Sequence, residues 1–287
     1  MTNKALAINP PAGLHHITTH ASDWLWAVFA IMLLSLFTNF FWTCLRRDRN
    51  KAPYQIPIVV LAVSSIAYFS MASDLGFTVV LNRHGTRQVW FVRYIQWFIN
   101  APLILLGLLI FTGMTISDIL ATLFFSWVVV VSGLVGALVQ SSYKWGYYAF
   151  GLAALFYIWF RLFGHSLRYP FRGGGRVRSG YMGLAAYITF IWTLYPICWG
   201  LSEGSSTITP TSEMVFYGIL DIIAAPIFLA LYTSWVSTLP YDELAAGLST
   251  ADRGVVERKA PLPEERAEPG RGQEAPGEQA ERSNEHH

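Results

Sequence analysis

Arg93 and Asp221 are charged residues that stand inside long apolar stretches of the chain. An ionisable side chain is costly to bury in such a stretch, so each marks a candidate functional site. A buried guanidinium needs an anionic partner, and Asp221 is the only acid well inside the stretch 213–237. We expect the two side chains to form an ion pair, through water, in the outer half of a helix bundle. The alternative is that the pair only fixes the register of two helices.

Polar residues follow Arg93 at helical spacing. Gln96 and Asn100 come at steps of three and four residues, and Gly107 lies two turns further along the chain. Side chains at such steps share one face of an α-helix. The pattern therefore predicts a polar stripe that points into the bundle.

A second helical pattern is aromatic. In the segment WTLYPICW (192–199), Trp192, Tyr195 and Trp199 fall on one face of a helix. Large aromatic residues at this spacing are more often part of a packed core than of a ligand pocket. Both interpretations stay open from the residues alone.

Two further acids have simpler interpretations. Asp118 begins an apolar stretch, where a carboxylate near a helix N-terminus offsets the macrodipole. Asp74 stands near the outer end of the stretch 56–79, so its case for a function is weak.

The remaining candidates for chemistry predict neither a metal site nor an enzyme. Three histidines stand in a polar N-terminal segment: His15, His16 and His20. Histidines in such a segment usually bind no metal. The two cysteines, Cys44 and Cys198, lie in or beside apolar stretches and are interpreted as simple apolar residues. No nucleophile–base arrangement occurs. We expect no nucleic-acid partner.

The composition indicates a membrane protein. Apolar residues make up 53% of the chain and charged residues 13%, about half the usual charge of a soluble domain. A spanning helix needs roughly 20 mostly apolar residues. Seven stretches meet this need, and the first resembles a retained helix rather than a cleaved signal peptide: 23–45, 56–79, 90–112, 117–140, 145–164, 181–201 and 213–237. The prediction is an all-α bundle of seven transmembrane helices.

Basic residues predict the orientation of this bundle. They gather between the first and second stretches and between the fifth and sixth: Arg46, Arg47, Arg49, Lys51, Arg168, Arg172, Arg176 and Arg178. An excess of Lys and Arg marks cytoplasmic loops, so the N-terminus is expected outside and the C-terminus inside. We expect a polar extracellular segment (1–22), the membrane domain (23–240) and a disordered cytoplasmic tail (241–287) that is rich in Pro, Gly, Glu and Arg.

Several motifs resemble those of the microbial rhodopsins, in the correct order. RYIQWFINAPLILLGLL (93–109) is similar to their third helix, SGLVGAL (132–138) to the fourth, WTLYPICWGLSEG (192–204) to the sixth and ILDIIAAPIF (219–228) to the seventh. The resemblance covers all seven stretches, 23–237. It implies a bacteriorhodopsin-like fold with Asp221 in a counter-ion group and Arg93 as its partner. Glu203 and Glu213 would be outer proton-release carboxylates. The retinal pocket would be lined by Trp97, Gly133, Trp192, Tyr195 and Trp199.

The chain departs from the family pattern at the chromophore. In the family, retinal forms a Schiff base with a lysine one turn after the helix-seven aspartate. That position is Ala225 here, and the segment from Met214 to Pro240 contains no lysine. Because a Schiff base needs a primary amine, covalent retinal is excluded and we expect no cofactor.

The proton path of the family is incomplete as well. Gln96 replaces the proton-acceptor aspartate, Asn100 replaces a threonine, and Gly107 occupies the proton-donor position. A light-driven proton pump is therefore untenable on this interpretation.

Lysine-less members of the family are the fungal opsin-related proteins, which include heat-shock-induced plasma-membrane proteins. Similarity to them implies a plasma-membrane protein of the stress response, which acts in the lipid bilayer through other membrane proteins or as a homo-oligomer. One alternative is a light-independent channel for protons or anions, lined by Arg93, Gln96, Asn100 and Asp221. Another is a non-covalent binder of retinal or a different apolar ligand.

Overall fold

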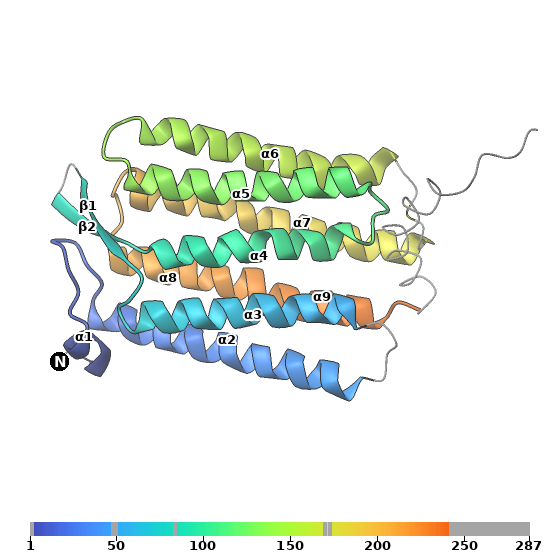
Figure 1. Ribbon diagram of the computed structural model, residues 1–287, viewed down its shortest axis with the longest axis horizontal. Coiled ribbons are helices and arrows are strands. Elements are labelled where there is room, and N and C mark those ends of the chain that lie inside the picture. Colours follow the sequence, from blue (N-terminus) through green and yellow to red (C-terminus); the bar gives the residue numbers. More distant parts are fainter. Residues whose placement is uncertain (1–2, 47–50, 83–84, 169–170, 172–173, 241–287) are drawn as a thin grey trace, which may run out of the picture.

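The computed structural model describes the whole chain except residues 1–2, 47–50, 83–84, 169–170, 172–173 and 241–287. Its seven long apolar segments lie side by side in one bundle (Figure 1), and each is long enough to cross a membrane. They are α2 (Thr19–Leu45), α3 (Ala52–Ala72), α4 (Phe91–Leu109), α5 (Ile116–Leu138), α6 (Lys144–Arg168), α7 with η1 (Gly174–Trp199, Gly200–Gly204), and the continuous segment α8, η2 and α9 (Pro210–Ile222, Ile223–Ile227, Phe228–Ser237). The predicted seven-helix architecture is confirmed.

The predicted end of the second stretch at residue 79 is wrong. Helix α3 ends at Ala72, and the chain then turns through Asp74 and Gly76, whose φ angles of 56° and 81° are left-handed. Left-handed residues cannot continue an α-helix. The apolar residues that follow form strand β1 (Thr78–Asn82), which pairs antiparallel with β2 (Gly85–Val89).

The N-terminal segment folds against this hairpin. The His15 amide donates to the Thr86 carbonyl at 2.9 Å, and the Gln88 amide donates to the His15 carbonyl at 3.1 Å. The short helix α1 (Lys4–Ile8) lies at the same end of the bundle (Figure 1). We name this end, with α1, β1 and β2, the hairpin end. The predicted tail, 241–287, lies outside the described residues.

Helix α7 begins earlier than predicted. The sixth apolar stretch is predicted to begin at residue 181, but α7 already starts at Gly174. Further along, a Cβ on Gly180 would lie 1.9 Å from Nε1 of Trp235 in α9. Only a glycine allows α7 and α9 to approach so closely.

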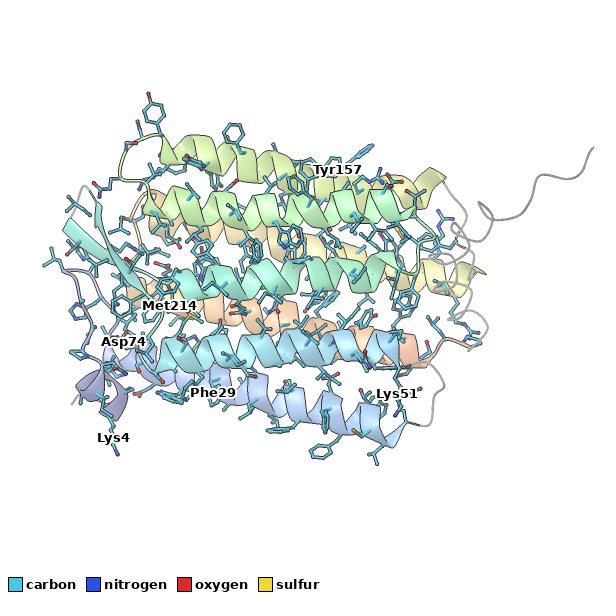
Figure 2. All side chains as sticks on the ribbon, in the orientation of Figure 1. Lys4, Phe29, Lys51, Asp74, Tyr157 and Met214 are labelled. Carbon is cyan, nitrogen blue, oxygen red and sulfur yellow. The ribbon has the colours of Figure 1, made fainter. Side chains whose placement is uncertain are left out.

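Lysines in the described part of the chain lie at the ends of the bundle. Lys4 is the first residue of α1, Lys51 precedes α3, and Lys144 begins α6. Figure 2 shows Lys4 at the hairpin end and Lys51 at the opposite end. Most of the side chains buried between the helices are instead apolar or aromatic.

Candidate functional site

Arg93, on the first turn of α4, forms a salt bridge with Glu203. Its Nη2 donates to Glu203 Oε1 at 3.0 Å, and the two side chains are 5% and 1% exposed. The guanidinium also lies over the ring of Tyr217, 3.3 Å from the ring centroid. The direct partner of Arg93 is therefore Glu203, and the predicted pairing with Asp221 through water stays a prediction.

Glu203 reaches this position through an irregular helix end. It lies in the π-helical segment η1, which adds a wider turn after α7. Its carboxylate also accepts a hydrogen bond from Tyr94 Oη at 2.8 Å and others from Ser202 and Tyr217. A regular helical projection of the sequence cannot foresee this inward turn, which is why Glu203 was placed with the outer carboxylates only by resemblance.

Asp221 is held by neutral donors. Its Oδ1 accepts from Tyr195 Oη at 2.5 Å and from Trp97 Nε1 at 3.1 Å, and its Oδ2 accepts from Tyr68 Oη at 2.6 Å. The residue is fully buried. Two of these donors, Trp97 and Tyr195, were predicted to lie in the site, whereas Tyr68 was not.

A second salt bridge closes the hairpin end. Arg87 Nη2, in β2, lies 2.5 Å from Glu213 Oε2, and Arg87 Nη1 donates to the Ile208 carbonyl at 2.9 Å. Both charged side chains are buried, at 5% and 1% exposure. Glu213 was predicted as an outer carboxylate, but its partner was missed because the hairpin was missed. Each outer carboxylate thus has its own arginine.

The polar stripe of α4 is buried as predicted. Gln96 Nε2 and Asn100 Nδ2 donate to Ser64 Oγ at 3.4 Å and 2.9 Å. Gln96 Oε1 and Asn100 Oδ1 accept no hydrogen bond from the described residues. One turn separates Ser64 from Tyr68 on α3, so the same test for helical spacing would have found both residues in the stretch 56–79.

Gly107 lies two turns deeper on α4, against Tyr232 of α9. A Cβ at Gly107 would lie 3.4 Å from the Tyr232 hydroxyl, a contact that leaves little free space at this level. Ala225 is fully buried in η2, one turn after Asp221.

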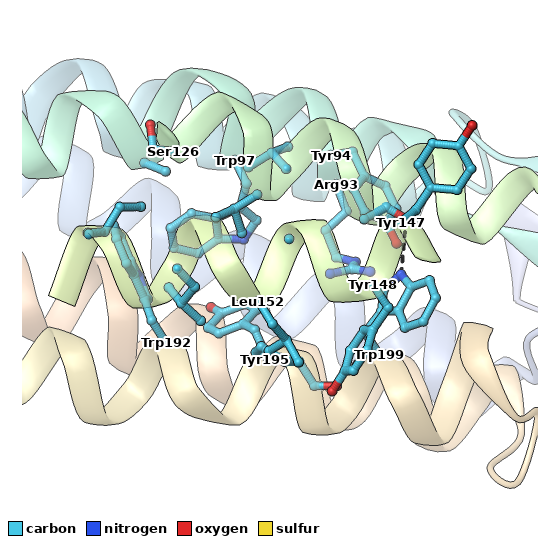
Figure 3. A pocket seen from close by; sticks show the side chains of 18 of the residues that line it. Arg93, Tyr94, Trp97, Ser126, Tyr147, Tyr148, Leu152, Trp192, Tyr195 and Trp199 are labelled. Atoms are coloured by element: carbon cyan, nitrogen blue, oxygen red, sulfur yellow. Dashed lines mark hydrogen bonds between the residues drawn. The ribbon is translucent and has the colours of Figure 1, made fainter. Parts of the chain in front are cut away.

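The aromatic residues surround a cavity. Its empty space, including its mouth, is about 840 Å³, and its walls include all five predicted pocket residues: Trp97, Gly133, Trp192, Tyr195 and Trp199. Figure 3 shows Trp192 at one end, Trp199 with Tyr148 at the other, and Arg93 between them. Trp199 Nε1 donates to the Gly133 carbonyl at 3.0 Å, and its ring stacks on Tyr148. The aromatic face thus lines a space instead of only packing a core.

A model of the bacteriorhodopsin-like protein family matches residues 19–239, which include all seven membrane helices. The chain belongs to this family. The predicted resemblance to microbial rhodopsins is thereby confirmed.

Members of the family with similar sequences include fungal proteins. Protein FDD123 of Trametes versicolor is 54% identical over 235 residues, 81% of this chain and 83% of that protein. The 30 kDa heat shock protein of Saccharomyces cerevisiae is 33% identical over 86% of this chain and 83% of its own length. Neither name denotes an enzyme.

Solved structures of the family have the same architecture. The light-driven proton pump rhodopsin of Coccomyxa subellipsoidea matches with a TM-score of 0.72 at 34% identity. The match covers 77% of this chain and 99% of that one. The bundle described here is therefore one that also occurs in light-driven pumps.

Asp118 and Asp74 lie away from the buried groups around Arg93 and Asp221. Asp118 is in the first turn of α5, as predicted, and pairs with Arg161 at 2.7 Å. Asp74 follows α3 and is only 2% exposed. Burial raises the pKa of Asp74 to about 6, an effect that Gln88 and His16 oppose in part.

The histidines and cysteines add no metal site to the part of the chain that the structure describes. His16 Nδ1 lies 3.0 Å from the Gly13 carbonyl, and His15 joins the hairpin through its backbone. Cys198 is buried and Cys44 is exposed, so only Cys198 is an interior residue. No group of three or more His, Cys, Asp and Glu side chains gathers among the described residues.

Proposed function

We propose that this chain is a non-photochemical member of the bacteriorhodopsin-like family: an opsin-related membrane protein that does not attach retinal covalently and does not pump protons in light. One observation carries the proposal. Ala225, one turn after Asp221, stands where the family resemblance places the Schiff-base lysine, and the described segment Pro210–Ser237 contains no lysine. Alanine has no amine with which to form the bond.

The residues around Ala225 support the proposal. Gln96 and Gly107, at the acceptor and donor positions, carry no titratable group for a proton relay. The carboxylate of Asp221 is bound by neutral donors in place of a Schiff-base cation. The fold is shared with a light-driven pump, so the difference in function rests on these side chains.

Reconstitution with all-trans retinal tests the proposal. We expect the purified protein to show no visible absorption band beyond that of free retinal, and no change on hydroxylamine treatment. The Coccomyxa rhodopsin, prepared in the same way, is the positive control. A band that hydroxylamine bleaches would overturn the proposal. A Lys144→Arg variant would then show whether Lys144, at the start of α6, carries the chromophore.

In the cell, we propose a plasma-membrane role in the stress response, exerted through other membrane proteins or as a homo-oligomer. The similarity to a 30 kDa heat shock protein supports this role.

The N-terminus would lie outside, since basic residues flank the helices at the end opposite the hairpin: Arg46, Lys51, Arg176 and Arg178. A tagged chain should increase in amount after heat shock and label the cell surface. Unchanged amounts would contradict the stress role.

Non-covalent binding of an apolar ligand is the second candidate function. The cavity favours it, because ligand pockets are typically concave and lined mainly by hydrophobic and aromatic side chains. Its lining is mainly aromatic and aliphatic.

An ion path is less well supported. The unpaired oxygens of Gln96 and Asn100 suit a hydrated segment, but the pair of Arg93 and Glu203 occupies the route towards the hairpin end. Conductance in planar bilayers tests this path. Ion-selective current that changes in an Arg93→Gln variant would favour it over the first two candidates.

A further inference from the structure

The guanidinium of Arg93 is only partly satisfied. Nη2 donates to Glu203, but Nε is buried and has no hydrogen-bond partner in the described structure. The residue is 4% exposed and belongs to the wall of the aromatic cavity. A buried N–H without an acceptor is costly, so the cavity offers one unused donor at this point of its wall.

The rest of the wall suits a hydrocarbon. Besides Arg93, the rings of Trp97 and Trp192 and the aliphatic side chains of Leu155 and Ile158 on α6 line the cavity. Trp97 and Trp192 meet edge to face, with their ring centroids 6.3 Å apart. A flat or extended apolar molecule fits such a lining.

The mouth of the cavity lies among membrane-spanning helices. Tyr147 on α6 lines the cavity and is 38% exposed, and Leu152 and Pro196 are half-buried wall residues. Tyr148 Oη donates to the Pro196 carbonyl at 3.2 Å and so joins α6 to α7 beside this opening. Because these residues belong to spans, a ligand would enter from the lipid phase rather than from water.

Charge selects the polar group of the ligand. Glu203 already neutralises Arg93, and the neighbouring pair of Arg87 and Glu213 is neutral as well. A ligand carboxylate on Arg93 would add another anion beside Glu203 in a low-dielectric interior, where repulsion is strong. A neutral oxygen accepts the Nε–H bond without this cost, and a pure hydrocarbon leaves the donor unused.

We propose that the cavity binds a neutral lipid with a single terminal oxygen, an alcohol or a ketone, whose oxygen accepts a hydrogen bond from Arg93 Nε while its hydrocarbon body lies against the rings of Trp97 and Trp192. This inference rests on the second candidate function and specifies its ligand class. It is independent of the Ala225 argument, because neither an alcohol nor a ketone of this kind needs a covalent link to the chain.

Three probes with the same carbon skeleton test the inference. All-trans-retinol carries a neutral hydroxyl, anhydroretinol lacks oxygen, and all-trans-retinoic acid carries a carboxylate. None of them is an aldehyde. Binding to the purified protein is followed by quenching of tryptophan fluorescence, since Trp97, Trp192 and Trp199 line the cavity. We expect retinol to bind about tenfold more tightly than either of the others, as for a hydrogen bond to a charged group.

Two variants separate the hydrogen bond from the charge. In Glu203→Gln, Arg93 loses its anion, so retinoic acid should gain at least about tenfold in affinity relative to retinol. In the double variant Arg93→Met with Glu203→Gln, both charges of the pair are removed, so retinol and anhydroretinol should bind alike. Gly151→Leu puts a side chain into the cavity wall, where a Cβ meets only ordinary contacts, the nearest at 3.6 Å, and should weaken all three probes.

Equal affinities for the three probes in the unaltered protein would overturn the inference, as would a retinol preference that persists without Arg93. Binding that Gly151→Leu does not weaken would also contradict it. If no probe binds, the ligand class and the second candidate function both fail, whereas the retinal spectrum separately decides the proposal about Ala225. Far-UV circular dichroism of each variant verifies that its helices are intact.

Discussion

Removing the carboxylate of Glu203 should destabilise the protein strongly, and through Arg93 in particular. The variant Glu203→Gln leaves a guanidinium that is 5% exposed without a counter-charge. Breaking one side of a buried ion pair typically costs about 3–5 kcal/mol. Because Gln can still accept the hydrogen bond from Tyr94, we expect the lower end of that range.

A double-mutant cycle isolates the pair. For Arg93→Gln combined with Glu203→Gln, the coupling free energy should be about 2–3 kcal/mol, because two contacting side chains are removed. For Arg93→Gln combined with Asp221→Asn, the coupling should stay below about 1 kcal/mol, since Asp221 is bonded to Tyr68, Tyr195 and Trp97 instead.

The assay is reversible unfolding in mixed micelles of a mild detergent and sodium dodecyl sulfate, followed by far-UV circular dichroism. All four proteins of each cycle are measured under the same conditions. A coupling between Arg93 and Asp221 as large as that between Arg93 and Glu203 would refute the pairing and restore the ion pair predicted from the sequence.

Two further predictions concern the scaffold. Gly180→Ala should destabilise the protein by about 2 kcal/mol or more in the same unfolding assay, because the new Cβ would lie 1.9 Å from Trp235. Gly183→Ala, on the same helix, places its Cβ in open space and should not destabilise the protein. Equal effects of the two variants would argue against this packing. Asp74→Asn should raise stability at pH 7.5 by at most about 3 kcal/mol but have little effect at pH 4. The pKa of Asp74 is about 6, above its ordinary value of 3.8, so the ionised carboxylate destabilises the folded protein only as the pH rises from about 4 to above 6. Equal stabilisation at both pH values would contradict the burial of this carboxylate.

The membrane segments could be predicted from the sequence because hydropathy alone identifies them. All seven were found, and all but the second and the sixth approximately at their observed positions. The second was extended too far because the residues of β1, TVVLN, are as apolar as a helix end. The left-handed turn at Asp74 that separates helix from strand leaves only a weak signal, a single glycine at position 76.

Which residues approach the centre could be predicted, but not which of them pair. Helical spacing placed Arg93, Gln96 and Asn100 on one buried face, as observed. The direct partner of Arg93 was missed because Glu203 turns inward through a π-helical segment, a local departure from 3.6 residues per turn that the pattern does not show. Arg87 was missed for a related reason, since a residue expected in a loop lies instead in a buried strand.

The cavity could be predicted only through the family resemblance. Aromatic residues at helical spacing are compatible with either a packed core or a pocket, and the choice depends on how α5, α6 and α7 lie together. Small residues at the wall, such as Gly133 and Gly151, leave space where larger side chains would fill it.

The central claim is that this protein makes no covalent bond to retinal. Its most direct test is to incubate the purified chain with all-trans retinal, reduce with borohydride to fix any Schiff base, and measure the mass of the intact chain and of its peptides. We expect the unmodified mass, while the Coccomyxa rhodopsin treated in parallel should gain one retinyl group. A stoichiometric retinyl adduct on any lysine of this chain would contradict the account.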